Sequence, residues 1–136
     1  MDIFQKTIRV RDLDDVTRIY FLSDQHLGEV GAHVRFVRDM VEYIKHDPSA
    51  VVITLGDLAG MIAPDDRRFD PEQVAPHLKI EDMASWGDVM VELLKDILRP
   101  LKGRVAASLI GNHEDSYSKK KNVKINDGIA RVLGSK

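Results

Sequence analysis

The sequence predicts an α/β fold with a mainly parallel or mixed sheet and helices on its faces. Three short apolar segments rich in β-branched and aromatic residues alternate with two longer segments of helical periodicity. The order strand, helix, strand, helix, strand favours crossover connections and therefore parallel strands. A chain of 136 residues has the length of one ordinary domain, so we expect residues 1–136 to form a single domain.

Each predicted strand ends at a polar turn. The strands cover, in order, residues 19–22, 51–55 and 105–110. The turns that follow them are Ser23-Asp24, Gly56-Asp57 and Gly111-Asn112. The first strand is an unbroken apolar run, IYFL, which is typical of a strand buried on both faces of its sheet. Segment 3–10 is a further candidate strand, which would form a hairpin with the first.

Two segments have apolar residues at helical spacing. Val34, Val37, Val41 and Ile44 form one stripe, which predicts a helix over about 32–46 that ends before Asp47-Pro48. A second stripe predicts a helix over about 80–98, closed by a proline and a glycine. The segment 60–78 contains three prolines and is predicted to be a long surface loop, and the tail from Asn122 fits a short terminal helix.

The composition excludes several classes of protein. Hydrophobic residues make up 43% and charged residues 31% of the chain, as in globular proteins that function in water. The formal charge of −2 provides no overall field that would attract nucleic acid or an anionic membrane. The chain has no cysteine, so disulfides and thiolate sites are excluded. With no apolar stretch long enough for a membrane and no secretory signal, we expect a cytoplasmic protein with no membrane partner.

Polar side chains of three separate segments follow the three strands. They are Asp24 and His26 after the first strand, Asp57 after the second, and Asn112 with His113 after the third. The carboxyl ends of parallel strands meet at one edge of the sheet, where open α/β sheets bind ligands. Carboxylate, imidazole and amide donors together suit a divalent ion such as Mn, Fe or Zn better than Ca. The sequence therefore predicts a metal site at this edge.

The motifs DQH, GD and GNHE, in this order and each after a predicted strand, resemble those of the calcineurin-like metallophosphoesterases. The resemblance runs from about Ile19 to Glu114 and implies the N-terminal half of the αββα sandwich of that family. It implies that Asp24 and His26 bind a first metal, that Asp57 bridges two metals, and that Asn112 binds the second.

The resemblance also implies a reaction. Two divalent ions (Mn, Fe or Zn) would supply a hydroxide that attacks a phosphate mono- or diester. Asn112 and His113 would contact the substrate, and His113 would donate a proton to the departing oxygen. The expected partner is thus a phosphate ester substrate, with a nucleic acid as one form of it.

Two departures from the family pattern affect these expectations. Relatives commonly carry an acidic residue at the position of Gly60, where it orients the catalytic histidine, so we expect His113 to lack this support. The family also continues beyond GNHE with further histidine motifs, which this chain does not contain. We therefore expect a truncated domain, a weak second metal site, and a sheet left open to self-association or to a complementing C-terminal half.

The sequence leaves three alternatives open. The chain is either a phosphoesterase or a non-catalytic metal-binding or assembly module on the same fold. Glu114 either supports the site or forms a salt bridge in a loop. The lysines that follow GNHE either hold a phosphate-rich substrate or form a solvated basic loop; they are Lys119, Lys120, Lys121 and Lys124. The other histidines, which we expect to be structural or solvated, are His33, His46 and His77.

Overall fold

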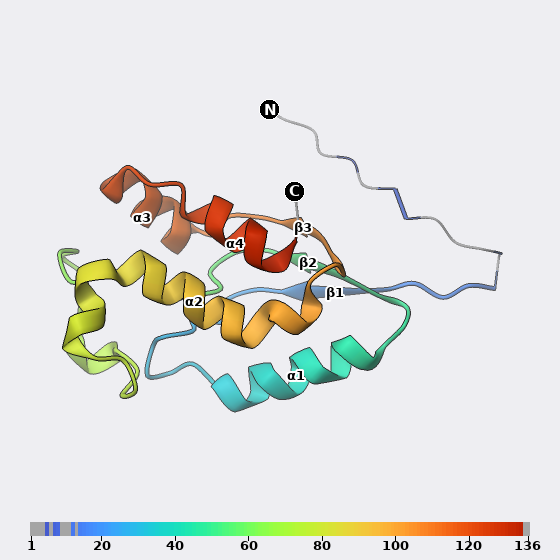
Figure 1. The fold of residues 1–136 in the computed structure, drawn as a ribbon, viewed down its shortest axis with the longest axis horizontal. Coiled ribbons are helices and arrows are strands. Elements are labelled where there is room, and N and C mark those ends of the chain that lie inside the picture. The colour runs from blue at the N-terminus through green and yellow to red at the C-terminus, as the bar shows by residue number, and fades with distance from the viewer. Residues whose placement is uncertain (1–4, 6, 9–11, 13, 135–136) are drawn as a thin grey trace.

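The protein has an α/β fold built on a three-stranded parallel sheet (Figure 1). The computed structural model describes residues 5, 7, 8, 12 and 14–134. The strands, in spatial order, are β1 (Arg18–Leu22), β2 (Ala50–Thr54) and β3 (Val105–Ser108). The predicted parallel arrangement is confirmed, and each strand lies within two residues of its predicted bounds.

Four α-helices and three short 3₁₀ helices connect and follow the strands. The α-helices are α1 (Val34–His46), α2 (Trp86–Leu98), α3 (Asn112–Lys121) and α4 (Ile125–Leu133). The 3₁₀ helices are η1 (Pro71–Gln73), η2 (Ile80–Ser85) and η3 (Arg99–Leu101). The helix predicted over 80–98 thus divides in two, because the buried stripe of α2 begins only at Trp86 and continues through Met90 and Leu94.

The helix α3 is absent from the sequence prediction. Its sequence, NHEDSYSKKK, has no apolar stripe, so periodicity does not reveal it. Electrostatics favours it instead: acidic residues stand in its first turn and lysines in its last, which complements the helix dipole. The Lys119 ammonium and the Asp115 carboxylate also pair across one turn, at 2.6 Å. Of the two alternatives for the lysines, a loop is wrong for Lys119, Lys120 and Lys121, which are exposed residues of a helix.

The core lies against one face of the sheet. Side chains buried on α1, α2 and α4 join one cluster with alternate residues of the strands, among them Leu22 and Val52. Successive residues of a strand point to opposite faces, so Ile19 and Phe21 lie on the other face. They remain 48% and 61% exposed. The prediction that the first strand is buried on both faces is therefore wrong, because one face of β1 is left uncovered.

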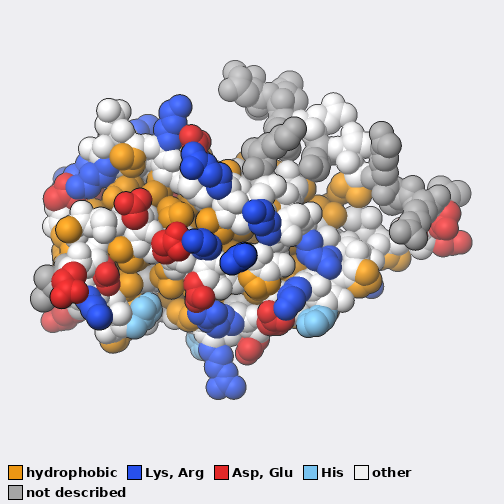
Figure 2. Space-filling model, viewed as in Figure 1, with side chains coloured by type: hydrophobic (Ala, Val, Ile, Leu, Met, Phe, Trp, Pro, Cys, Tyr) orange, Lys and Arg blue, Asp and Glu red, His pale blue; other side chains and the backbone are white. Residues whose placement is uncertain are grey.

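The remaining segments agree with the sequence in part. The segment 60–78 is a loop that contains only η1. Most of segment 3–10 lies outside the described residues, and its described members, at positions 5, 7 and 8, belong to no strand. Within the described part of the chain, every helix is too short or too polar to cross a membrane. Figure 2 shows acidic and basic side chains interspersed on the face in view.

Candidate metal centre

The loops that follow β1 and β2 run side by side beyond the ends of the strands. The backbone N–H of Asp24 donates to the carbonyl oxygen of Gly56 at 3.2 Å, and that of His26 donates to Asp57 at 3.1 Å. These bonds extend the parallel pairing past the sheet edge. They bring Asp24, His26 and Asp57 together, with one ligand atom of each within 4.8 Å of the others.

All three of these residues have left-handed backbone conformations. Their φ angles are +52° for Asp24, +44° for His26 and +51° for Asp57. Among the described residues other than glycine, only Asn122, which ends α3, shares a positive φ. Such a conformation costs about 1–3 kcal/mol per residue, and residues that keep it cluster at functional sites. The strained backbone therefore coincides with the three residues that the sequence predicts as metal ligands.

The third motif meets the second by direct backbone contact. A Cβ on Gly111 would lie 2.2 Å from the backbone nitrogen of Asp57, and one on Gly56 would lie 2.1 Å from that of Gly111. Both positions therefore require glycine. The close approach lets the backbone N–H of His113 donate to Asp57 Oδ1 at 2.9 Å, which fixes the orientation of that carboxylate.

The buried side chain of Glu114 links the second and third motifs by hydrogen bonds. Its side chain is 1% exposed and accepts hydrogen bonds from the backbone N–H groups of Asp57, Leu58 and Gly111, at 2.9, 2.8 and 3.1 Å. Of the two alternatives for this residue, the salt-bridged loop is wrong, because Glu114 is buried in the first turn of α3. It supports the site by holding the backbone that carries Asp57.

The imidazoles of His26 and His113 face one carboxylate, that of Glu29. The rings of His26 and His113 lie edge to face, with centroids 4.6 Å apart. Glu29 Oε1 lies 3.3 Å from Nδ1 of His26 and 4.0 Å from Nδ1 of His113. As expected from Gly60, no residue at that position supports His113; Glu29 is a carboxylate near its ring, at a distance too long for a hydrogen bond.

Sequence reasoning missed Glu29 because it belongs to none of the three motifs. The available signal was its spacing, since a carboxylate three residues after His26 can turn back toward that ring in a tight turn. The structure forms such a turn: the Glu29 N–H donates to the His26 carbonyl oxygen at 3.0 Å.

Asn112 and the lysines occupy the outside of this region. Asn112 is exposed at the first position of α3, directly before His113. The second metal ion expected between Asp57 and Asn112 stays a prediction. Lys121 pairs with the Asp65 carboxylate at 2.7 Å, so this lysine holds the proline-rich loop against α3. A role for the lysines with nucleic acid is likewise untested.

A cavity of about 450 Å³ adjoins the candidate ligands Asp24 and His26 and is also lined by Phe21, His33 and Phe36. His33 is exposed there, as are His46 and His77 elsewhere on the surface.

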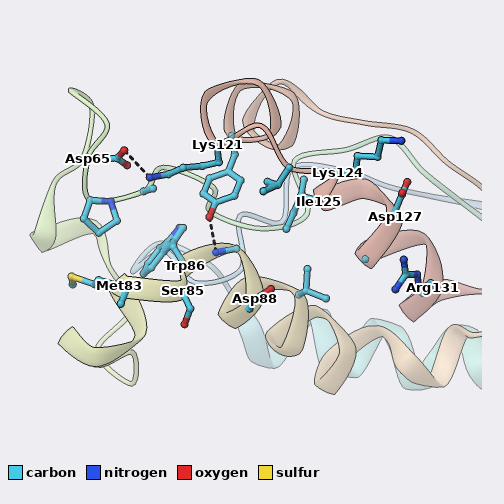
Figure 3. Close-up of a pocket in the computed structure, with 18 residues that line it drawn as sticks. Asp65, Met83, Ser85, Trp86, Asp88, Lys121, Lys124, Ile125, Asp127 and Arg131 are labelled. Atoms are coloured by element: carbon cyan, nitrogen blue, oxygen red, sulfur yellow. Dashed lines mark hydrogen bonds and ion pairs between the residues drawn. The ribbon is translucent and has the colours of Figure 1, made fainter.

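A larger cavity, of about 840 Å³, lies elsewhere, between α2, α3 and α4 (Figure 3). It is lined by Trp86, Lys124 and Arg131 and by none of the candidate ligands. Figure 3 shows Lys121 reaching across one side of it to Asp65. Size alone therefore does not identify the site.

The donor set fits a divalent ion. Asp24 Oδ1 and His26 Nε2 lie 4.0 Å apart, so an ion about 2.0–2.2 Å from both would lie nearly on the line between them. Two carboxylates and one imidazole match the preferences of Mn, Fe or Zn. No protein-family model, no curated protein and no solved structure matches the chain. The geometry of these side chains is therefore the feature of the chain that points to a function.

Proposed function

We propose that this chain is a metal-dependent phosphoesterase that hydrolyses phosphate mono- or diesters. The observation that supports the proposal is the cluster of Asp24, His26 and Asp57, within 4.8 Å of one another on strained backbone at the strand ends. A second imidazole, that of His113, stands beside it. Residues that retain strain together with a shared set of donor atoms are better explained by binding than by folding.

The residues of the cluster have separate roles in this proposal. Asp24, His26 and Asp57 would hold the ion, and the His113 N–H fixes the orientation of the Asp57 carboxylate. A bound divalent ion lowers the pKa of water and offsets negative charge on phosphoryl oxygens. His113 gives a proton to the departing oxygen, a task that suits imidazole near neutral pH. The exposed Asn112, at the first position of α3, contacts the phosphate through its side-chain amide.

A second candidate function is a non-catalytic metal-binding or assembly module. The exposed apolar side chains of Ile19 and Phe21 on the uncovered face of β1 favour it, since such a face promotes association. The two candidates share the metal site and differ in turnover. Hydrolysis therefore separates them, whereas metal binding alone does not.

The test combines calorimetric titration with Mn²⁺ and hydrolysis of an aryl phosphate and an aryl phosphodiester. Asp57→Asn keeps the shape of the side chain and removes its charge, so we expect it to weaken Mn²⁺ binding by at least about tenfold and to abolish hydrolysis. The matched control is Asp96→Asn, which changes an exposed carboxylate of α2 paired with Arg38. A surface pair of this kind contributes little to stability, so the control should behave as wild type.

The outcomes discriminate cleanly. Mn²⁺ binding without hydrolysis of either ester supports the assembly module. Equal binding by the wild type and by Asp57→Asn contradicts the metal site itself. Hydrolysis that survives Asp57→Asn assigns the activity to a contaminant or to another site.

A further inference from the structure

The back of the candidate metal centre contains two buried nitrogens without hydrogen-bond partners among the described residues. They are Nδ1 of His26 and Nδ1 of His113. A buried donor left unpaired costs about 1–3 kcal/mol, so such an atom calls for an explanation. Glu29 Oε1 faces both nitrogens, at 3.3 and 4.0 Å.

The backbone of Glu29 is held on two sides. Glu29 forms an isolated antiparallel bridge with Val74, and the neighbouring Val30 N–H donates to the Gln73 carbonyl oxygen at 2.7 Å. On the other side, the Gly60 N–H donates to the Leu27 carbonyl oxygen at 2.8 Å. The loop that carries Glu29 is therefore fixed to both segments it passes, which places its carboxylate reproducibly.

Gly60 provides the space that the Glu29 side chain occupies. A Cβ on Gly60 would lie 2.7 Å from Glu29 Cγ and 3.0 Å from Glu29 Oε1. Any side chain at position 60 would therefore displace Glu29. The Gly60 carbonyl accepts a hydrogen bond from Trp86 Nε1 at 2.9 Å, so this backbone cannot easily move aside. Glycine at 60 and glutamate at 29 are coupled by geometry.

We propose that Glu29 is the positioning residue of this centre, a single carboxylate that holds the Nδ1 side of both His26 and His113. The inference rests on the proposed function, in which His26 binds the ion and His113 donates a proton to the departing oxygen. A ring that donates its Nδ1–H to Glu29 carries its lone pair on Nε2 when neutral. For His26 this nitrogen is the one that faces Asp24, as a metal ligand requires.

The proposal makes a prediction about exchanging the two positions. Glu29→Ala removes the carboxylate and should lower Mn²⁺ affinity and turnover by about 10- to 100-fold. Gly60→Asp alone should also impair both, because the new side chain collides with Glu29. The double variant Glu29→Ala/Gly60→Asp should recover most of the loss, since the Cβ of residue 60 would lie 3.0 Å from the position of Glu29 Oε1. Two harmful changes are thus expected to compensate each other.

The first readout needs neither metal nor activity. Nitrogen-15 NMR of the imidazoles in the metal-free protein, at a pH where the spectra show neutral rings, reports which nitrogen carries the proton. In wild type we expect Nδ1–H on His26 and His113, and in Glu29→Ala a shift toward Nε2–H. Glu29→Gln keeps the size and one acceptor oxygen, so it should be intermediate and serves if the alanine variant does not fold. Glu92→Ala, which changes an exposed carboxylate of α2 paired with Lys95, is the control.

Each result decides the matter. Unchanged protonation of both rings in Glu29→Ala, or in Glu29→Gln if only that variant folds, overturns the proposal. A double variant no better than Glu29→Ala overturns the coupling with Gly60. If the wild type binds no Mn²⁺ and hydrolyses no ester, the proposed function fails, but the NMR result still reports whether Glu29 positions the two rings.

Discussion

The two ends of the sheet satisfy their polar groups in opposite ways. At the amino end of the strands, the Asp47 carboxylate accepts hydrogen bonds from Arg18, from the Tyr20 hydroxyl and from the Ser49 N–H, at 3.0, 2.8 and 2.9 Å. At the carboxyl end, Asp24 and Asp57 stand on strained backbone, and two imidazole nitrogens lack partners among the described residues.

The comparison distinguishes carboxylates that stabilise the fold from carboxylates that are available to a ligand. A carboxylate whose hydrogen bonds are all made by its own chain has nothing left for a ligand, whereas donors held together but unsatisfied are ready to bind one. The amino end joins the strands to α1 through Asp47. The carboxyl end is stabilised by backbone contacts and by Glu114. Among the described residues, the Asp24 and Asp57 carboxylates each accept one hydrogen bond, from the Ser23 hydroxyl and from the His113 N–H, against three at Asp47. The following predictions test this division.

The largest effect is expected at Glu114, the one buried carboxylate at the site end among the described residues. Glu114→Ala leaves three backbone N–H groups without their acceptor, so the free energy of unfolding should fall by about 3 kcal/mol or more. Urea denaturation followed by circular dichroism measures the loss. A loss below about 1 kcal/mol would mean that this end does not depend on the buried carboxylate.

A smaller effect is expected at Asp47, together with a dependence on pH. Hydrogen bonds from the Ser49 N–H and from Tyr20, and the charge of Arg18, lower the pKa of Asp47 below its ordinary value. Because the folded pKa is depressed, this stabilisation is present above the ordinary carboxyl pKa of about 4 and is lost as the pH falls through the folded value. Asp47→Asn should therefore lower the Tm at pH 7 and have a smaller effect near pH 2. An equal loss at both pH values would contradict the assignment.

At the site end, a substitution should stabilise the fold while it damages binding. Asp24→Gly relieves the positive φ, so we expect the free energy of unfolding to rise by about 0.5–1 kcal/mol. In wild type, saturating Mn²⁺ should raise the Tm by mass action, and this increase should disappear in the variant. Thermal unfolding with and without Mn²⁺ measures both effects. A destabilised variant would show that Asp24 serves the fold.

The smallest effect is expected at Tyr20. Its hydrogen bond to Asp47, with desolvation and the charge of Asp47 adding to it, raises the pKa of Tyr20 to about 12. The stabilisation is complete below the ordinary pKa of about 10 and is lost as the pH rises through 12. Ultraviolet titration should show one tyrosine that ionises near pH 12 and that is absent in Tyr20→Phe. Ionisation of Tyr20 near pH 10 would contradict the bond to Asp47.

The sequence was informative where hydrophobicity changes abruptly. The strands and their polar ends could be predicted because apolar runs stop at Asp24, Asp57 and Asn112, and parallel pairing then brings the ends together. The helices α1 and α4 carry clear apolar stripes. The exposure of Phe21 could not be predicted, because an apolar run does not reveal which face of a sheet its neighbours will cover.

The parts that were missed depend on contacts between distant residues. The helix α3 is polar throughout, so no hydrophobic periodicity marks it in the sequence. It is stabilised by charges that complement the helix dipole and by the hydrogen bonds of Glu114 in its first turn. The Glu29 carboxylate fits beside the two imidazoles only because position 60 carries no side chain, and no pattern in the chain links positions 29 and 60. The sequence could predict that the polar strand ends meet at one edge of the sheet, whereas the position of Glu29 beside the two imidazoles appears only in the three-dimensional arrangement.

The hydrogen bond from Trp86 to Gly60 gives this chain a built-in optical reporter. Trp86 is the single tryptophan, its indole is buried, and it contacts the backbone that leaves room for Glu29. Its emission spectrum therefore senses the back wall of the centre without any added label. Rearrangement there, on titration or after substitution, becomes visible as a change in wavelength or intensity at micromolar protein.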